Sequence, residues 1–332
     1  MKQVAMNLRA RLAVLLIASL TLPLSVHAQS TEAKLAAVEK LPAQERQQKL
    51  IDGAKGEGEA VVYANMDVAA MKPLTEGFMK RFPGVKATSV HFSGAAIITR
   101  IDSESRAGKQ LSDVVLSGQL GVLASIEKRI AARYRSPERD ALRDGFKDKE
   151  GLWTAYMTNV MVSAYNTKLV KKEELPRSVE ELLKPRWKNK LAMDSQSYVW
   201  FGTMLQYLGE ENGLRFMKRL NDQNLQHTRG RRLMTQLLAA GEHDLAVETN
   251  LNSVMSLSKQ GAPLAFAPIQ PYFLSPSLLF MSANAPHPFA GALFTDYLLS
   301  EDGQRIIVTT NRMPAHPKVK SPESQLLEQE AL

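Results

Sequence analysis

The sequence contains no cysteine. Disulfide bonds, thiolate metal sites and a cysteine nucleophile are therefore excluded, and so is a lipid anchor attached to a cysteine. Hydrophobic residues make up 44% of the 332 residues and charged residues 23%, which is typical of a globular protein. A chain of this length can form two lobes or domains.

The sequence also lacks the short motifs that carry common enzyme chemistry. It has no GxSxG elbow, no HExxH helix, no P-loop and no glycine-rich dinucleotide fingerprint. Glu57, Glu59 and Asp67 are acidic, but no partner for acid–base chemistry is placed beside them. We therefore expect a protein that is not an enzyme and that uses no cofactor.

Only the start of the chain carries a long hydrophobic run. Three basic residues precede the apolar core 12–26, and Val26-His27-Ala28 gives a small-x-small cleavage pattern. An uncleaved membrane anchor is the alternative, but the apolar core is short for a spanning helix. We expect residues 1–28 to be a cleaved signal peptide. The mature protein then starts near Gln29 and is soluble, in the periplasm if the cell is Gram-negative.

The sequence carries little excess charge once this segment is removed. Cleavage takes away three positive charges and lowers the formal charge from +8 to +5. Such mild basicity does not favour nucleic acid, which is an unusual partner outside the cytoplasm. We expect a monomer that binds no nucleic acid.

Residues 60–118 alternate between strand and helix patterns. The predicted strands are residues 60–64, 85–92 and 111–116, and the predicted helices are residues 67–82 and 95–107. This alternation implies a parallel sheet with right-handed crossovers. The carboxyl ends of the three strands then meet at one edge of the sheet, where open α/β sheets bind ligands.

Small and polar residues lie at this predicted edge. Ser93-Gly94 leads directly into a helix, so that free backbone N–H groups and the positive end of the helix dipole face a ligand. The candidate ligand-binding residues in this half are Tyr63, Asn65, Ser93, Gly94 and Ser117. Two alternatives stay open, because a serine at a helix start can simply cap the helix and Tyr63 can be a core residue at a strand end.

A second α/β pattern begins at Leu175 and supplies the opposite set of candidates. Asp194-Ser195-Gln196-Ser197 is typical of a helix start, and Arg229 is a possible fork for a carboxylate or phosphate. The candidate ligand-binding residues here are Ser195, Tyr198, Arg229 and Asn250. The alternative for Arg229 is a solvated side chain beside Arg231 and Arg232.

Four strings, in this order, resemble a known family and together span nearly all of the chain beyond the signal peptide. They are VVYAN with FMKRFPGVK, SGAAIITRIDSESRAGKQLSDVVLSG, ELPRSVEELLKPRWKNKLAMDS, and APHPFAGALFTDYLLSEDGQRII. The chain thereby resembles the periplasmic substrate-binding proteins of ABC importers. The similarity is greatest to the family-1 extracellular solute-binding proteins, in the cluster that contains ferric-ion binders.

The resemblance implies an α/β protein with the type II-like, two-lobed periplasmic binding protein fold. Its lobes are joined by crossing hinge strands and close around a solute, which is handed to an inner-membrane ABC permease. Long strand-like runs at residues 153–166 and 273–281 suit such crossings. The expected parts are lobe one at 31–159 plus 273–320, lobe two at 160–272, and a flexible tail at 321–332.

The ferric-binding members of this cluster use two adjacent tyrosines, usually with histidine and glutamate. This sequence has no Tyr-Tyr pair, and it reads Val247-Glu248-Thr249-Asn250-Leu251-Asn252 where the pair is expected. We therefore predict a small anionic or strongly polar organic solute, such as a carboxylate, phosphonate or phosphate ester, and no metal. Ferric ion is the alternative ligand, and a sensory receptor is the alternative to an importer.

Overall fold

The computed structural model describes residues 30–92 and 96–330, with side chains described up to residue 326. The predicted signal peptide at 1–28 and the candidate residues Ser93 and Gly94 lie outside the described residues. Within the described part of the chain, no helix combines the length and the apolar character that crossing a membrane requires.

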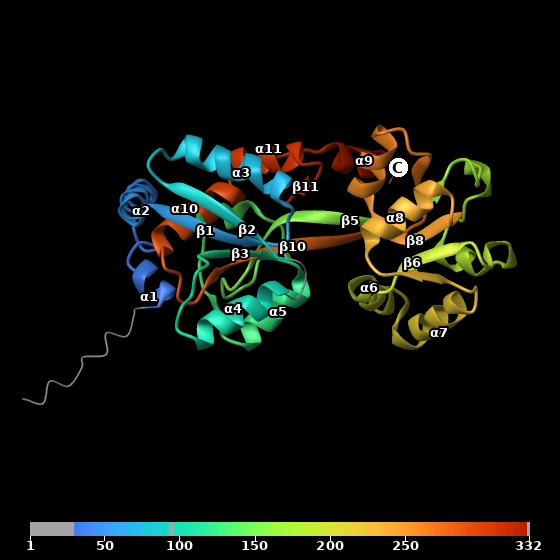
Figure 1. Ribbon diagram of the computed structural model, residues 1–332, viewed down its shortest axis with the longest axis horizontal. Helices are drawn as coiled ribbons and strands as arrows, with labels where there is room; N and C mark the ends of the chain where they lie inside the picture. The colour runs from blue at the N-terminus through green and yellow to red at the C-terminus, as the bar shows by residue number, and fades with distance from the viewer. Residues whose placement is uncertain (1–29, 93–95, 331–332) are drawn as a thin grey trace, which may run out of the picture.

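The molecule is elongated and has two α/β lobes joined by the long strands β5 (Thr154–Asn166) and β10 (Phe273–Ser282) (Figure 1). The first half of lobe one contains α1 (Thr31–Leu35), α2 (Ala43–Glu57), β1 (Glu59–Ala64), α3 (Val68–Arg81), β2 (Lys86–His91), α4 (Ala96–Arg106), β3 (Val114–Ser117), α5 (Gln119–Glu127) and β4 (Ala131–Ala132). The C-terminal part of the chain adds α10 (Pro288–Leu299), α11 (Glu301–Thr309), β11 (Met313–Pro314) and α12 (Pro322–Glu330).

Lobe two is built from the middle of the chain. After three short 3-10 helices between residues 172 and 187, it contains β6 (Leu191–Asp194), α6 (Tyr198–Leu208), α7 (Glu210–Asn221), β7 (Gln226–Thr228), α8 (Arg231–Ala240), β8 (Leu245–Asn250), α9 (Leu251–Lys259) and β9 (Leu264–Ala267). The predicted α/β alternation is therefore present in both halves of the chain.

The strands of both lobes belong to one hydrogen-bonded sheet, which in the described residues has the order β2-β1-β3-β10-β5-β8-β6-β7. In lobe one β1 pairs in parallel with β2 and β3, and in lobe two β6 pairs in parallel with β7 and β8. The sheet is continuous because β10 and β5 pair with each other and β5 continues to β8. The sequence indicated two separate strand–helix patterns, and the pairing of β5 with β10 joins their strands into this one sheet.

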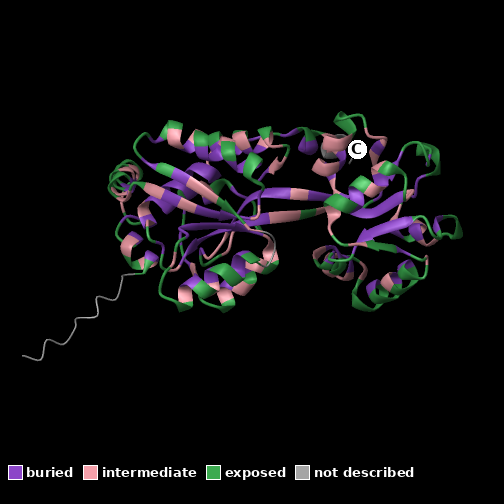
Figure 2. Cartoon of the chain, in the orientation of Figure 1, coloured by how far each residue is buried: buried purple, intermediate pink, exposed green. Residues whose placement is uncertain are grey.

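The hydrophobic core is divided between the lobes. In the described residues, lobe one has one large cluster, which includes seven residues of α10; eleven of the twelve residues of this helix are buried. Lobe two has three smaller clusters, which lie around Trp187, around Met234 and around Leu251. Figure 2 shows the buried residues running through both lobes and along the crossing strands. The boundaries at residues 159/160 and 272/273 stay a prediction.

Three local expectations differ from the structure. The spacing of Leu35, Val38, Leu41 and Leu50 predicts one helix over 31–56, but α1 ends at Leu35 and α2 begins only at Ala43, directly after Pro42. In the predicted helix 67–82, the early position of Pro73 favours a place in the first turn of α3. The Asp67 carboxylate caps this helix by accepting the Ala70 N–H at 2.9 Å, so α3 begins at Val68 and Pro73 lies further inside it.

The third difference is the C-terminus, where a flexible tail was expected and helix α12 is found. Ser321 and Ser324 start this helix by exchanging hydrogen bonds, with N–H to hydroxyl distances of 3.0 and 3.2 Å. Leu326 then packs against a small cluster of lobe two that includes Val160 and Leu251. In residues 321–326, whose side chains are described, the serine cap and the Leu326 contact both support the start of α12.

Candidate functional site

Two adjoining cavities lie between the lobes and share Asn65, Asn159 and Ser277 in their linings. We call the first the α9 chamber, because the start of α9 lines it, and the second the α5 chamber, because the start of α5 lines it. Their volumes are about 500 and 520 Å³, respectively. Cavities of this size suit small-molecule ligands.

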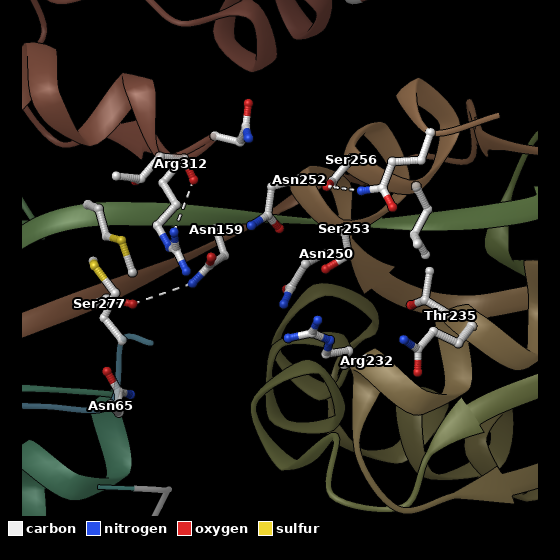
Figure 3. Close-up of a pocket in the computed structure, with 17 residues that line it drawn as sticks. Asn65, Asn159, Arg232, Thr235, Asn250, Asn252, Ser253, Ser256, Ser277 and Arg312 are labelled. Atoms are coloured by element: carbon white, nitrogen blue, oxygen red, sulfur yellow. Dashed lines mark hydrogen bonds between the residues drawn. The ribbon is translucent and has the colours of Figure 1, made fainter. Parts of the chain in front are cut away.

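The α9 chamber is lined mainly by uncharged polar side chains. Its lining includes Asn65, Asn159, Thr235, Gln236, Asn250, Asn252, Ser253, Ser256, Gln260, Ser277, Thr310 and Asn311. Arg312 and Arg232 approach it from opposite sides, the first from the segment after α11 and the second from α8 (Figure 3). The chamber therefore combines positive charge with many hydrogen-bonding groups.

The two arginines of the α9 chamber differ in how far their charge is already balanced. Arg312 donates to the Asp67 carboxylate at 3.0 Å and to the Thr310 carbonyl at 3.0 Å. Burial raises the pKa of Asp67, but hydrogen bonds from the Ala70 N–H and from Arg312 outweigh it, so this pKa lies below its ordinary value. Arg232 has no ion pair with any described residue.

The start of α9 offers further donors to this chamber. Asn250 is the N-cap residue, and its side chain makes no capping hydrogen bond. Asn252 and Ser253 follow in the first turn and also line the chamber. The first N–H groups of a helix have no partner within the helix, and they favour negative charge.

The α5 chamber is more apolar, but it contains a matching set of donors. Its lining includes Ile98, Ser117, Gly118, Gln119, Leu120, Gly121, Ala124, Val199, Arg231, Ser275 and Pro276. Gly118 is the N-cap residue of α5, and no side chain caps this helix. Ser117 is only 3% exposed, and its hydroxyl has no hydrogen-bond partner among the residues that the structure describes. A Cβ atom at Gly121 would lie 2.4 Å from this hydroxyl, so any larger residue there would force the Ser117 side chain to move.

Arg231 is fixed in the α5 chamber by a buried carboxylate. Its Nε donates to the two oxygens of Glu248 at 2.8 and 3.0 Å, and the Ser197 hydroxyl donates to the same carboxylate. Glu248 is fully buried, whereas the Arg231 side chain is 27% exposed. The two Nη groups of Arg231 have no partner within the described chain, so the end of the guanidinium is left for a ligand.

No aspartate, glutamate or tyrosine is among the described residues that line the two chambers. The chambers therefore combine arginines, helix starts and neutral polar groups without an opposing carboxylate on their walls. Such a lining favours negatively charged ligands.

Three of the predicted residues, Asn65, Ser117 and Asn250, line the chambers. Tyr63 does not, because it is a core residue, which is the alternative that the sequence left open. Its hydroxyl donates to Glu104 at 2.7 Å, its ring contacts Phe92 with centroids 4.8 Å apart, and burial together with Glu104 raises its pKa to about 12. Ser93 and Gly94 lie outside the described residues.

The remaining predicted residues belong to lobe two and are not in the linings. Ser195 is exposed, and its N–H donates to the Thr228 carbonyl at 2.9 Å. Tyr198 is 62% exposed. Arg229 is also exposed: α8 begins only at Arg231, so it is the next two arginines that line the chambers.

Sequence reasoning missed the groups on the crossing strands and at the start of α8. Asn159 on β5 and Ser277 on β10 meet at the centre of the cleft, where the Asn159 amide donates to Ser277 at 3.4 Å. The two long strand-like runs were the available signal for these residues. For Arg231 and Arg232 the signal was a glycine directly followed by an amphipathic helix.

Comparison with known proteins identifies the molecule's relatives. Residues 110–331 match the family described as bacterial extracellular solute-binding protein. An uncharacterised protein of Haemophilus influenzae is 22% identical over 267 residues, which are 76% of each chain.

Three similar solved structures have different ligands in their descriptions. The periplasmic binding protein AfuA from Actinobacillus pleuropneumoniae, with fructose-6-phosphate bound, is 22% identical, with TM-score 0.68 and coverage of 80% of this chain and 87% of that one. A Trichodesmium protein in complex with iron and citrate is 20% identical, with TM-score 0.69 and coverage of 80% and 89%. Iron-bound HitA from Pseudomonas aeruginosa is 16% identical, with TM-score 0.70 and coverage of 79% and 88%. At these identities the likeness shows a shared fold.

Proposed function

The chain belongs to the family of bacterial extracellular solute-binding proteins, and from this premise we propose that it binds a small anionic organic solute in the cleft between its lobes. It delivers this solute to an inner-membrane ABC permease and catalyses no reaction. Lobe one, at 31–159 and 273–320, and lobe two, at 160–272, close on the solute by a hinge motion of the crossing strands.

The charge on the walls of the two chambers carries this proposal. Arg231, Arg232 and Arg312 line them, and no carboxylate does so among the described residues. The uncapped starts of α5 and α9 add backbone N–H groups. Carboxylate, phosphonate and phosphate groups accept hydrogen bonds from both kinds of donor, and charge-assisted hydrogen bonds are about twice as strong as neutral ones.

The same lining disfavours ferric ion, which is the alternative ligand. Ferric ion is a hard, highly charged cation that prefers phenolate and carboxylate oxygens. No tyrosine, aspartate or glutamate of the described chain lines either chamber, and no group of three or more potential metal-ligating side chains occurs there. Arg232, which forms no ion pair with a described residue, would also repel a bare cation, whereas Arg231 and Arg312 are already paired with carboxylates.

A thermal-shift screen tests the ligand class. The probes are phosphate esters, phosphonates, carboxylates, neutral sugars, amino acids, ferric citrate and ferric ion. A ligand at about a hundred times its dissociation constant adds roughly 2.7 kcal/mol of stability, which raises the melting temperature of a chain of this size by several degrees. We expect organic anions to give this shift and neutral sugars to give none.

The ferric alternative makes the opposite prediction in the same screen. If only ferric citrate or ferric ion raised the melting temperature, with a visible tyrosinate charge-transfer band, the organic-anion proposal would be wrong. The role in import is tested separately. Genes for a permease and an ATPase beside this gene favour an importer, whereas a receptor gene in their place favours sensing.

A further inference from the structure

We infer that the cleft contains two separate anion subsites, one in each chamber, and that the solute carries two anionic groups joined by an uncharged middle. This inference rests on the proposed function and specifies the substrate class for the same cleft. A solute with a single anionic group would leave one of the two subsites unused.

Two consecutive arginines at the start of α8 line different chambers. Arg231 and Arg232 begin α8, and neighbouring residues of an α-helix point about 100° apart. In this structure Arg231 lines the α5 chamber and Arg232 lines the α9 chamber. One helix start therefore supplies an arginine to each chamber; Glu248 pairs with Arg231, whereas no described carboxylate pairs with Arg232.

The subsite in the α5 chamber has donors from both lobes. The Arg231 guanidinium is fixed by Glu248 through Nε alone, so its two Nη groups form a free fork. Ser117, from lobe one, is 97% buried and has a hydroxyl without a partner in the described chain. The hydroxyl is open to the chamber, so it can donate a hydrogen bond to a ligand acceptor there. The start of α5, with its free N–H groups, follows Ser117 directly and lines the same chamber.

The subsite in the α9 chamber is built from different residues with the same chemistry. Arg232 has no ion pair among the described residues, and the start of α9 contributes Asn250 and Ser253. Figure 3 shows Arg232, Asn250 and Ser253 grouped on the lobe-two side of this chamber. Arg312 contributes less charge to an anion here, because Asp67 already balances it.

The boundary between the two chambers is neutral. Asn65, Asn159 and Ser277 are shared by both linings, and they offer amide and hydroxyl groups only. These groups suit hydroxyl or carbonyl substituents in the middle of a solute. The alternation of positive, neutral and positive walls along the cleft is the pattern that a doubly anionic solute would match.

Titration calorimetry with two matched pairs of probes tests the inference. The pairs are fructose 1,6-bisphosphate against fructose 6-phosphate, and glutarate against butyrate. We expect the doubly anionic member of at least one pair to bind at least about tenfold more tightly than its partner, since it fills both subsites. Arg231→Gln and Arg232→Gln should each reduce this advantage to near zero.

Two further variants make the result specific. Arg229→Gln removes the same charge from the same segment outside both linings, and it should bind both probes as the wild type does. Arg231→Gln leaves the buried Glu248 without its partner and can impair folding. Ser117→Ala therefore serves as a second test of the α5 subsite. It should weaken the doubly anionic probe several-fold and leave the singly anionic probe unchanged.

Each outcome decides between the inference and the proposed function. If singly and doubly anionic probes bind equally in both pairs, the two-subsite inference is overturned while the proposed function stands. The same holds if Ser117→Ala and Arg231→Gln leave the affinity of the doubly anionic probe unchanged. If no organic anion of any kind binds, in these pairs or in the thermal-shift screen, both the inference and the proposed function are wrong.

Discussion

Buried carboxylates occur in both lobes, but they lie at opposite places relative to the cleft. In lobe one Asp113 precedes β3, at the amino-terminal edge of the parallel strands, and Asp296 lies within α10. In lobe two Asp194 ends β6 and Glu248 lies near the end of β8, at the carboxyl-terminal edge. Ligands of open α/β sheets bind at the carboxyl-terminal edge.

The partners of these carboxylates differ in the same way. Asp296 accepts hydrogen bonds from Arg46 and Tyr134, each at 2.8 Å, and so joins α2, α10 and the segment after β4. In lobe two, Asp194 accepts the N–H groups of Gln196 at 3.1 Å and Gly230 at 2.9 Å. These two N–H groups belong to the loops that start α6 and α8.

Buried carboxylates therefore serve different purposes in the two lobes. Asp113 and Asp296 connect elements of lobe one and line neither chamber, so we expect them to determine stability. The buried carboxylates of lobe two hold the helix starts that line the cleft, so we expect them to determine affinity as well. Three predictions test this division, beginning with the largest effect.

The first prediction is that Arg46→Ala strongly destabilises the protein but does not weaken ligand binding. It leaves Asp296 buried without its cationic partner, and burial already raises the pKa of Asp296. Breaking such a buried pair costs about 3–5 kcal/mol. Urea unfolding followed by circular dichroism measures this loss, and calorimetry with an anionic probe measures the affinity of the folded variant.

Lys55→Ala is the matched control, because it removes a positive charge from an exposed position on the same helix. It should change stability by no more than about 0.5 kcal/mol. An equal effect of the two variants would show that the buried pair has no special role in lobe one.

The second prediction concerns pH and Asp113. Burial raises the pKa of Asp113 to about 6, against an ordinary value of 3.8, although N–H groups of Val61 and His287 oppose the shift. The folded state therefore binds more protons than the unfolded state between these two values. The resulting stabilisation is present in full below about pH 3.8 and is lost as the pH rises through about 6, a loss of about 3 kcal/mol.

Asp113→Asn tests this sign, since an amide does not titrate. The stability of the variant relative to the wild type should improve by up to about 3 kcal/mol between pH 4 and pH 7. Unfolding curves at half-unit steps of pH measure the difference. A constant difference over this range would mean that Asp113 is ionised in the folded state throughout.

Most of the fold could be predicted from the sequence. The apolar periodicity of the sequence predicts helices over 198–208 and 231–240, and α6 and α8 have these bounds, with Ser197 and Gly230 as their N-cap residues. The long run at 153–166 was predicted as a crossing strand and is β5. Less could be said of segment 321–330, since the serine cap and one apolar contact that order it are weak signals in a polar sequence.

The site was only partly predictable, for a physical reason. Asn65, Ser117 and Asn250 could be found because they follow parallel strands, whose ends must share an edge. Asn159 and Ser277 are 118 residues apart and meet only through the pairing of β5 with β10. For Arg229, Arg231 and Arg232 the start of α8 was predictable, but which of these side chains line the cleft depends on how α8 is placed in lobe two, and the local sequence does not show this.

The third prediction concerns Asp194 in lobe two, where we expect the smallest loss of stability together with a loss of ligand affinity. Asp194→Ala leaves the N–H groups of Gln196 and Gly230 without their acceptor, which costs about 1–3 kcal/mol. The loops that start α6 and α8 then lose their mutual anchor, so the backbone that carries Arg231 and Arg232 is held less firmly, although Glu248 still pairs with Arg231. We expect the affinity for a bound organic anion to fall by about tenfold, equivalent to about 1.4 kcal/mol. Arg46→Ala, with its larger loss of stability, should leave that affinity unchanged. Calorimetry on both variants, at a temperature where each is folded, measures the two affinities. If affinity fell in proportion to stability in both variants, the buried carboxylates would not be divided between folding in lobe one and binding in lobe two.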